Sequence, residues 1–127
     1  MVVKVVDASA LAAVLFNEPE ADDVAARLAD GVLAAPALIE YELGNTCWKK
    51  CRRDPASAVA LRAALAVLSA LELKLHDVDV AATLRLAERH QITFYDASYL
   101  WLAGRLEASL ITLDGRLSRL GAAGVRG

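Results

Sequence analysis

The apolar and polar positions of this chain follow two different spacings. Short runs of β-branched residues, such as residues 2–6, are typical of strands that are buried on both faces. Longer stretches carry apolar residues every three or four positions, as Leu61, Leu65 and Leu68 do, which is typical of amphipathic helices. Strands alternating with helices predict an α/β fold, a three-layer α/β/α sandwich around a mainly parallel sheet of four to five strands.

Each spacing predicts a set of elements. Strands are expected at residues 1–7, 32–34, 72–76, 92–95 and 109–113, with a further brief edge strand at 124–125. Helices are expected at residues 8–16, 20–29, 36–53, 55–71, 96–106 and from Asp77 or Asp79 to 90, with a short helical turn after Asp114. Pro36 suits the first turn of the third helix.

Length and composition indicate one domain over residues 1–127. Hydrophobic residues make up 57% of the chain, but charges such as Arg62 and Glu72 interrupt every long apolar stretch. No segment therefore reaches the roughly 18 apolar residues of a membrane helix. The N-terminus also lacks the pattern of a secretion signal, so we expect a cytoplasmic protein without membrane attachment.

The net charge is −2, which argues against a protein that holds nucleic acid through its overall charge. Any contact with nucleic acid must then be local. Cys47 and Cys51 lie four residues apart without the further Cys or His residues of a zinc site, so we expect reduced, packed thiols. The excess of apolar residues suggests that a partner covers some helix faces.

Three aspartates, Asp7, Asp96 and Asp114, directly follow predicted strands. The carboxyl ends of parallel strands meet at one edge of a sheet, so these acids can converge there. Each alone has a simpler interpretation, because aspartate is a favoured helix N-cap that contributes about 1 kcal/mol. Capping does not require acids about 4 Å apart, which repel by on the order of 4 kcal/mol per pair. A hard cation such as Mg²⁺ or Mn²⁺ would relieve that repulsion.

A fourth acid is expected from the third helix, where Glu40 and Glu42 are the candidates. Two residues apart on a helix, they face roughly opposite ways, so only one can point into the site. Asn45 shares the face of Glu42. Both glutamates could equally be solvated, and spacing alone leaves the choice open.

Four short blocks carry a family resemblance. They are VDASAL at 6–11, ELGN at 42–45, YDASY at 95–99 and LITLD at 110–114. Together, over nearly the whole chain, they resemble the PIN-domain nucleases, and most closely the VapC-type toxins of toxin–antitoxin pairs. The resemblance implies a Mg²⁺- or Mn²⁺-dependent endoribonuclease that hydrolyses RNA phosphodiester bonds and leaves a 5′-phosphate.

The resemblance also implies roles for individual residues and partners. The catalytic, metal-binding quartet would be Asp7, Glu42, Asp96 and Asp114, supported by the polar side chains of Ser9, Asn45 and Thr112. It further implies a homodimer and a cognate antitoxin protein whose C-terminal segment lies across apolar helices.

One position departs from the family pattern. Many members carry another aspartate two residues after the last acid of the quartet, where this chain has Arg116. The departure argues against two fully bound metal ions. Arg116 is a candidate for a bidentate contact with an RNA phosphate, or simply a surface cation.

The most basic run follows Trp48 and contains four candidate RNA-binding residues, Lys49, Lys50, Arg52 and Arg53. Cations near a helix C-terminus are favourable without any ligand, which is the simpler interpretation. Tyr95, Tyr99 and Trp101 are expected in the core or in an interface rather than as a base-stacking platform.

Two other functions use the same residues. The quartet would also serve a metal-dependent DNA or structure-specific nuclease, although the short chain offers no additional region to clamp DNA. Alternatively, the acids are only helix caps and the chain is a catalytically silent binding module. Asparagine caps helices as well as aspartate does, so Asp7→Asn and Asp96→Asn would then change neither stability nor the response to metal.

Overall fold

The computed structural model describes residues 2–124 and has one sheet of four parallel strands in the order β3-β2-β1-β4. The strands are Val2–Val6 (β1), Gly31–Pro36 (β2), Leu73–His76 (β3) and Ser109–Ile111 (β4). Lys4 pairs with Leu33 of β2 and with Ser109 of β4, which makes β1 an inner strand. The predicted parallel α/β fold is confirmed.

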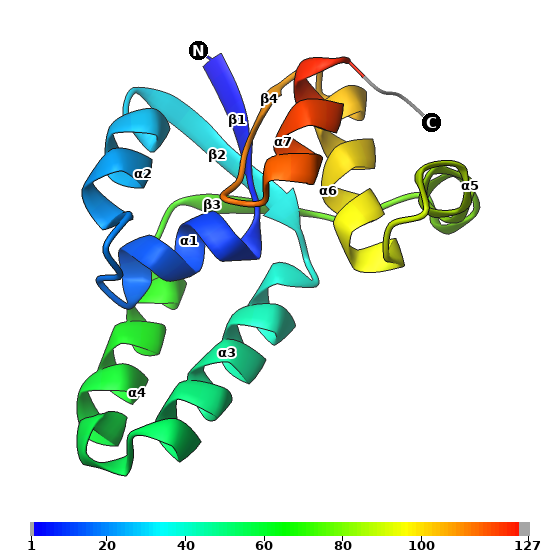
Figure 1. Cartoon of the computed structure of the whole chain (residues 1–127). Coiled ribbons are helices and arrows are strands. Elements are labelled where there is room, and N and C mark those ends of the chain that lie inside the picture. The colour runs from blue at the N-terminus through cyan, green and yellow to red at the C-terminus, as the bar shows by residue number, and fades with distance from the viewer. Residues whose placement is uncertain (1, 125–127) are drawn as a thin grey trace.

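Seven α-helices connect and cover these strands within the described part of the chain. They are Ala8–Leu15 (α1), Ala21–Leu28 (α2), Ile39–Arg53 (α3), Ala58–Ala66 (α4), Val80–His90 (α5), Phe94–Arg105 (α6) and Gly115–Ala122 (α7). Two 3-10 helices, Pro55–Ser57 (η1) and Val67–Ala70 (η2), flank α4. Figure 1 shows α3 and α4 side by side, projecting away from the sheet.

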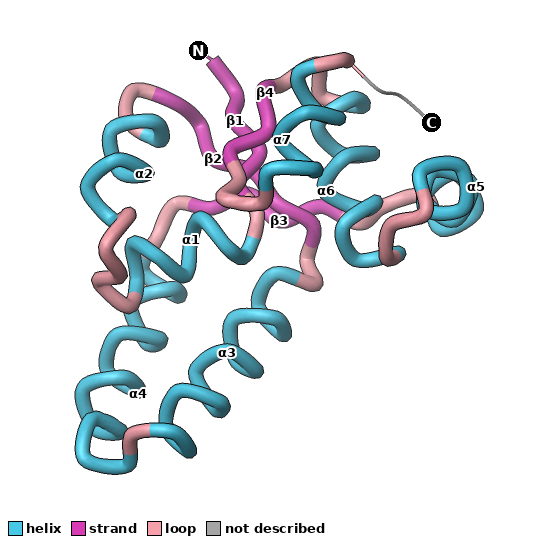
Figure 2. Tube along the Cα trace, in the orientation of Figure 1, coloured by secondary structure: helices cyan, strands magenta, loops and turns pink. Residues whose placement is uncertain are grey.

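The sheet lies at the centre of the molecule, between helices (Figure 2). α6 packs against β1, β2 and β4, while α1 and α2 lie together on the other side. Val5 and Val6 are fully buried because β1 is covered on both faces. Buried side chains of α1, α3 and α6, including Leu11, Leu43 and Leu102, complete the core.

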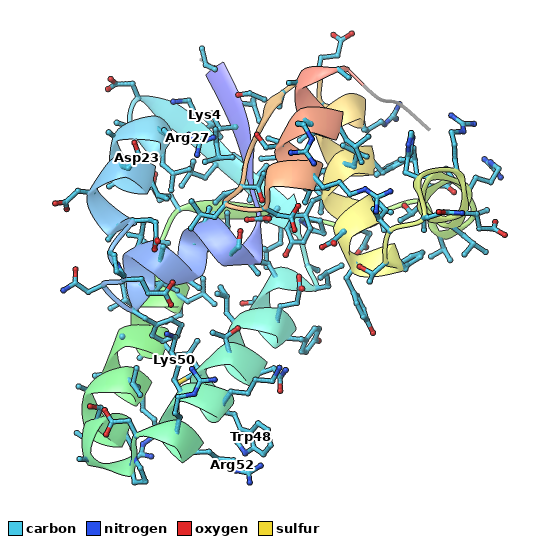
Figure 3. All side chains as sticks on the ribbon, in the orientation of Figure 1. Lys4, Asp23, Arg27, Trp48, Lys50 and Arg52 are labelled. Carbon is cyan, nitrogen blue, oxygen red and sulfur yellow. The ribbon has the colours of Figure 1, made fainter. Side chains whose placement is uncertain are left out.

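Lys4 fastens α2 to the sheet. Its Nζ donates to the carbonyl oxygens of Arg27 at 2.6 Å and Ala29 at 2.8 Å, which are free acceptors at a helix C-terminus. Arg27 in turn donates from Nη1 to the carbonyl of Thr112, just beyond β4, at 3.5 Å. Figure 3 shows Lys4 and Arg27 close together.

The strand predicted at residues 92–95 is wrong. Gln91 ends α5 with a left-handed φ of 53°, and α6 begins at Phe94 with Thr93 as its N-cap. The Thr93 hydroxyl accepts from the backbone N–H of Asp96 at 3.0 Å. Ile92 packs against the cluster of Leu86 and Ala97. This apolar residue therefore stabilises the start of a helix and does not belong to a strand.

Two helix boundaries also differ from the prediction. Pro36 ends β2, opposite His76, and does not open a helix. Proline has no N–H to donate, which a strand end tolerates. The helix expected at 55–71 is divided into η1, α4 and η2, which together expose most of their side chains.

The remaining predictions concern the chain end and the thiols. The turn expected after Asp114 is a full helix, α7, whereas Gly124 lies in a turn and Val125 lies outside the described residues. Cys47 and Cys51 are free thiols, as predicted, with their sulfurs 4.0 Å apart. Between residues 2 and 124, no helix is both long and apolar enough to span a bilayer.

Candidate active site

Asp7 lies where β1 ends and α1 begins, and only 5% of its surface is exposed. Its Oδ1 accepts from the backbone N–H of Ala10 at 3.0 Å, which caps α1. Its own backbone N–H donates to the carbonyl of Ile111 at 3.0 Å and so ties the end of β1 to the end of β4. The predicted N-cap and the predicted site residue are therefore the same side chain.

Two hydroxyl groups hold the Asp7 carboxylate. Ser9 Oγ donates to Oδ1 at 2.7 Å, and Thr112 Oγ1 donates to Oδ2. Each hydroxyl also accepts a backbone N–H, from Leu113 at 3.1 Å and from Asp114 at 3.0 Å, respectively. A carboxylate with both oxygens held in this way has a fixed orientation, as a site that must bind a ligand requires.

Asp114 follows β4 and caps α7, accepting from the N–H of Leu117 on Oδ1 at 2.8 Å. Because Thr112 contacts Asp7 and the backbone of Asp114, the two acids are linked through a single side chain.

Glu42 comes from the first turn of α3, and its Oε1 accepts from the Tyr99 hydroxyl at 2.6 Å. Tyr99 is 1% exposed, and it joins α6 to α3. Burial and the neighbouring Glu42 raise the pKa of Tyr99 above its usual range, so the phenol stays a neutral donor. The prediction that Tyr99 is a core residue is correct but incomplete, because the hydroxyl belongs to the site.

Asp96 lies in the first turn of α6, where the Thr93 cap places it, and its side chain is partly exposed. With Asp114 it lines an open hollow of about 270 Å³ between the end of α5 and the start of α7. The helix start, rather than a strand end, brings this acid to the site.

The four acids act on one another electrostatically. Burial is the largest cause of the raised pKa of Asp7, of Glu42 and of Asp96. Asp114 raises the pKa of Asp7 and of Asp96 further, while Asp7 and Asp96 both raise that of Glu42. The hydrogen bonds from Thr112 and Tyr99 act in the opposite direction but are too weak to cancel burial. Acids from four separate parts of the chain therefore lie close enough to influence one another.

Oxygen donors with unrelieved negative charge fit a hard divalent cation. Within residues 2–124 none of the four acids pairs with a basic side chain, whereas Lys50 and Glu18 form an ion pair at 2.7 Å. No group of three or more Asp, Glu, His or Cys in that range forms a ready-made metal cage. The chemistry of these oxygen donors suits a divalent cation.

The other predicted site residues differ in what they contact. Ser9 and Thr112 contact Asp7 as expected, whereas Asn45 is exposed and makes no hydrogen bond to the acids. Arg116 donates to the backbone carbonyls of His90 and Gln91, which are acceptors at the end of α5. Its guanidinium thus joins α5 to α7.

Replacing Tyr99 by phenylalanine tests the contact with Glu42. The lost hydrogen bond favoured the ionised carboxylate, so Tyr99→Phe should raise the pKa of Glu42 further. Carbon-detected NMR titration of the glutamate carboxyl groups measures this shift. Tyr41→Phe is the matched control, because Tyr41 is 80% exposed and neighbours Glu42 in sequence. An unchanged Glu42 titration in Tyr99→Phe would contradict the role given to the hydroxyl.

A match to a protein-family model shows which family the chain belongs to. A family model described as the PIN domain matches residues 4–123. The chain belongs to the PIN-domain family. The acids described above therefore lie at the carboxyl end of a PIN-domain sheet, and the resemblance noted in the sequence is confirmed at the level of the family.

Similar PIN-domain proteins include ribonucleases of the VapC group. Ribonuclease VapC3 of Pyrobaculum aerophilum is 32% identical over 120 residues, covering 90% of this chain and 91% of that protein. Ribonuclease VapC9 of Mycobacterium tuberculosis is 36% identical over 120 residues, covering 94% and 91%. The crystal structure of PAE2754 from Pyrobaculum aerophilum superposes with a TM-score of 0.76 at 29% identity, covering 98% of this chain and 89% of that one.

Proposed function

We propose that this PIN-domain protein is a metal-dependent endoribonuclease that acts as the toxin of a type II toxin–antitoxin pair. The observation that carries the proposal is the convergence of Asp7, Glu42, Asp96 and Asp114 without a positive partner among the described residues. The similarity to VapC ribonucleases over nine tenths of the chain supports RNA as the substrate.

The residues have separate tasks in this proposal. A bound Mg²⁺ or Mn²⁺ would supply the charge that activates water and stabilises the phosphoryl oxygens. Asp7, Asp96 and Asp114 would hold the cation, while Glu42 would bind it or orient the attacking water. Ser9 and Thr112 keep the Asp7 carboxylate aimed into the site, and Tyr99 does the same for Glu42.

The partners and the location belong to the same proposal. An antitoxin and a second copy of the chain would cover apolar side chains that the described structure leaves exposed. Val59 on α4 and Val67 on η2 are 76% and 48% exposed. We also propose a cytoplasmic location, where the RNA substrates of such a toxin occur. Size-exclusion chromatography with light scattering measures the mass of the protein alone, which tests the homodimer. The same measurement with a co-expressed antitoxin tests the complex.

A cleavage assay tests the proposed activity. The purified chain is incubated with tRNA, ribosomal RNA and messenger RNA, each with Mg²⁺, with Mn²⁺ and with a chelator. We expect discrete products that depend on the metal and carry a 5′-phosphate. A circular RNA is a useful further substrate, because it has no ends and only an endonuclease can open it.

Other outcomes would assign a different function. Metal-dependent cleavage of DNA flaps or duplexes, with RNA left intact, would identify a DNA or structure-specific nuclease. A folded chain that binds no divalent cation and cuts no nucleic acid would contradict the enzyme proposal and favour the silent binding module.

A further inference from the structure

The outward side of α3 carries exposed aromatic rings and cations. Tyr41 is 80% exposed and Trp48 is 54% exposed, although large aromatic side chains are usually mostly buried. Lys49, Arg52 and Arg53 are exposed beside Trp48. We propose that this α3 surface, made of Tyr41, Trp48, Lys49, Arg52 and Arg53, binds single-stranded RNA and leads it to the carboxylates. The proposal rests on the proposed ribonuclease function and names how that site takes its substrate.

Helix geometry makes the α3 surface continuous with the site. A residue seven positions after another lies almost on the same face, about 10 Å further along the helix. Lys49 has this relation to Glu42, and Trp48 has it to Tyr41. Lys49 therefore lies in line with a site acid, and the two rings form a parallel row beside it. A strand of RNA along α3 would meet both rows before it reaches Glu42.

Trp48 and Arg52 form a cation–π pair, with the guanidinium carbon 4.9 Å from the ring centre. Arg52 can occupy only one face of the indole, so the pair orients the ring without covering it. Trp48, Lys49, Arg52 and Arg53 line an open hollow of about 290 Å³. A ring for stacking beside cations for phosphates is the combination that binds single strands with little sequence preference.

Lys50 does not belong to the α3 surface, and its role as an RNA-binding residue stays a prediction. Its Nζ forms the ion pair with Glu18 and lies 5.5 Å from the centre of the Phe16 ring. Figure 3 shows Lys50 on one side of α3, and Trp48 and Arg52 on the other. Within the described chain Lys49, Arg52 and Arg53 form no such ion pair.

The negative charge of the site makes a nearby positive surface necessary for binding RNA. The carboxylates repel RNA phosphates, and the net charge of −2 gives no general attraction. Lys49, Arg52 and Arg53, which form no ion pair among the described residues and lie on the helix that carries Glu42, supply a local attraction for a polyanion. Exposed rings at both ends of the row favour RNA over an acidic peptide, because every base offers a face for stacking.

Binding of a labelled single-stranded RNA tests the proposal. Fluorescence anisotropy is measured over a range of salt concentrations with full-length Asp96→Asn protein, which keeps the RNA intact. The triple variant Lys49→Ala/Arg52→Ala/Arg53→Ala should bind more weakly, and the slope of log K against log salt should fall by about 2. Trp48→Ala should weaken binding about 10- to 100-fold. The controls Lys50→Ala and Arg85→Ala/Arg89→Ala, on other surfaces, should bind as the parent does.

Cleavage by the otherwise wild-type chain separates this inference from the proposed function. Loss of the α3 cations should raise KM and leave kcat nearly unchanged, since they act before the chemistry. Unchanged RNA affinity, salt slope and KM in the triple variant and in Trp48→Ala would overturn the inference. Altered self-association or antitoxin binding with unchanged RNA binding would also overturn it, by assigning the surface to a protein partner. RNA binding through α3 without any cleavage would contradict the proposed function alone.

Discussion

Replacing Asp96 by asparagine should lower RNA cleavage about 10²- to 10³-fold, the scale of losing one preorganised electrostatic group from an active site. The same substitution should make the cation-free protein more stable. Burial, Asp114 and Asp7 all raise the pKa of Asp96, so its ionised form is unfavourable in the folded state. Asparagine removes that charge, and it keeps the size and the polarity of the side chain.

The sign of the pH dependence follows from the raised pKa. Between the ordinary carboxyl value of 3.8 and the raised folded value, the folded protein binds more protons than the unfolded chain. Stability conferred by Asp96 therefore falls as pH rises through this window. The gain in Asp96→Asn should be largest at neutral pH and should disappear in acid, as thermal melts with a chelator would measure.

A matched control for this experiment is Asp79→Asn. Asp79 caps α5 by accepting from Ala82 N–H at 2.8 Å, and it lies outside the acid cluster. Asparagine retains the cap, so neither cleavage nor stability at neutral pH should change. A consistent loss of stability in Asp96→Asn at neutral pH, or full cleavage activity, would argue that Asp96 is only part of a helix start.

The second large effect concerns the hydroxyl that holds Asp7. Thr112→Val keeps the shape of a buried side chain but removes a hydrogen bond to a buried carboxylate, which contributes about 1.5–3 kcal/mol. The pKa of Asp7 should rise further, because the Thr112 hydroxyl lowers it. The destabilisation should accordingly be greatest above that pKa and smaller in acid, where Asp7 is protonated. Cleavage should fall as well.

Thr83→Val provides the control for the loss of a hydroxyl. Thr83 is completely buried, and its Oγ1 has no hydrogen-bond partner in the described structure. Removing an unsatisfied polar group should be neutral or stabilising. Urea unfolding of both variants, at about pH 8 and about pH 4, compares them. Equal stability of Thr112→Val and Thr83→Val would show that the Thr112 hydroxyl does not stabilise the Asp7 carboxylate.

The parts of the site that depend on local chemistry were predictable from the sequence. Asp7 and Asp114 follow apolar runs that are real strands, and each also caps the next helix. Asp96 reached the predicted place for a different reason, since the apolar run before it packs on α5 and α6 as the lead into a helix. Hydrophobic pattern places such a residue near the core, but it does not distinguish a short strand from a helix entry.

The contacts between side chains from distant elements were not predictable. Tyr99 shares a helix face with Asp96, three residues earlier, which was the available signal for its place in the site. Its contact with Glu42 depends on where the fold places α6 relative to α3. The ion pair between Lys50 and Glu18 likewise depends on where Glu18 lies in the fold.

The parallel pairing of β1 with β4 also determines when a folding chain acquires its site. Thr112 and Asp7 are 105 positions apart, and parallel strands cannot be joined by a local hairpin. Glu42 on α3 likewise contacts Tyr99 on α6 only once the fold has brought these two helices near each other. Contacts so distant in sequence slow folding, because the chain loses loop entropy before they form. Until β4 pairs with β1, the chain has the acids but not their arrangement, so the geometry of the site depends on joining two distant parts of the chain.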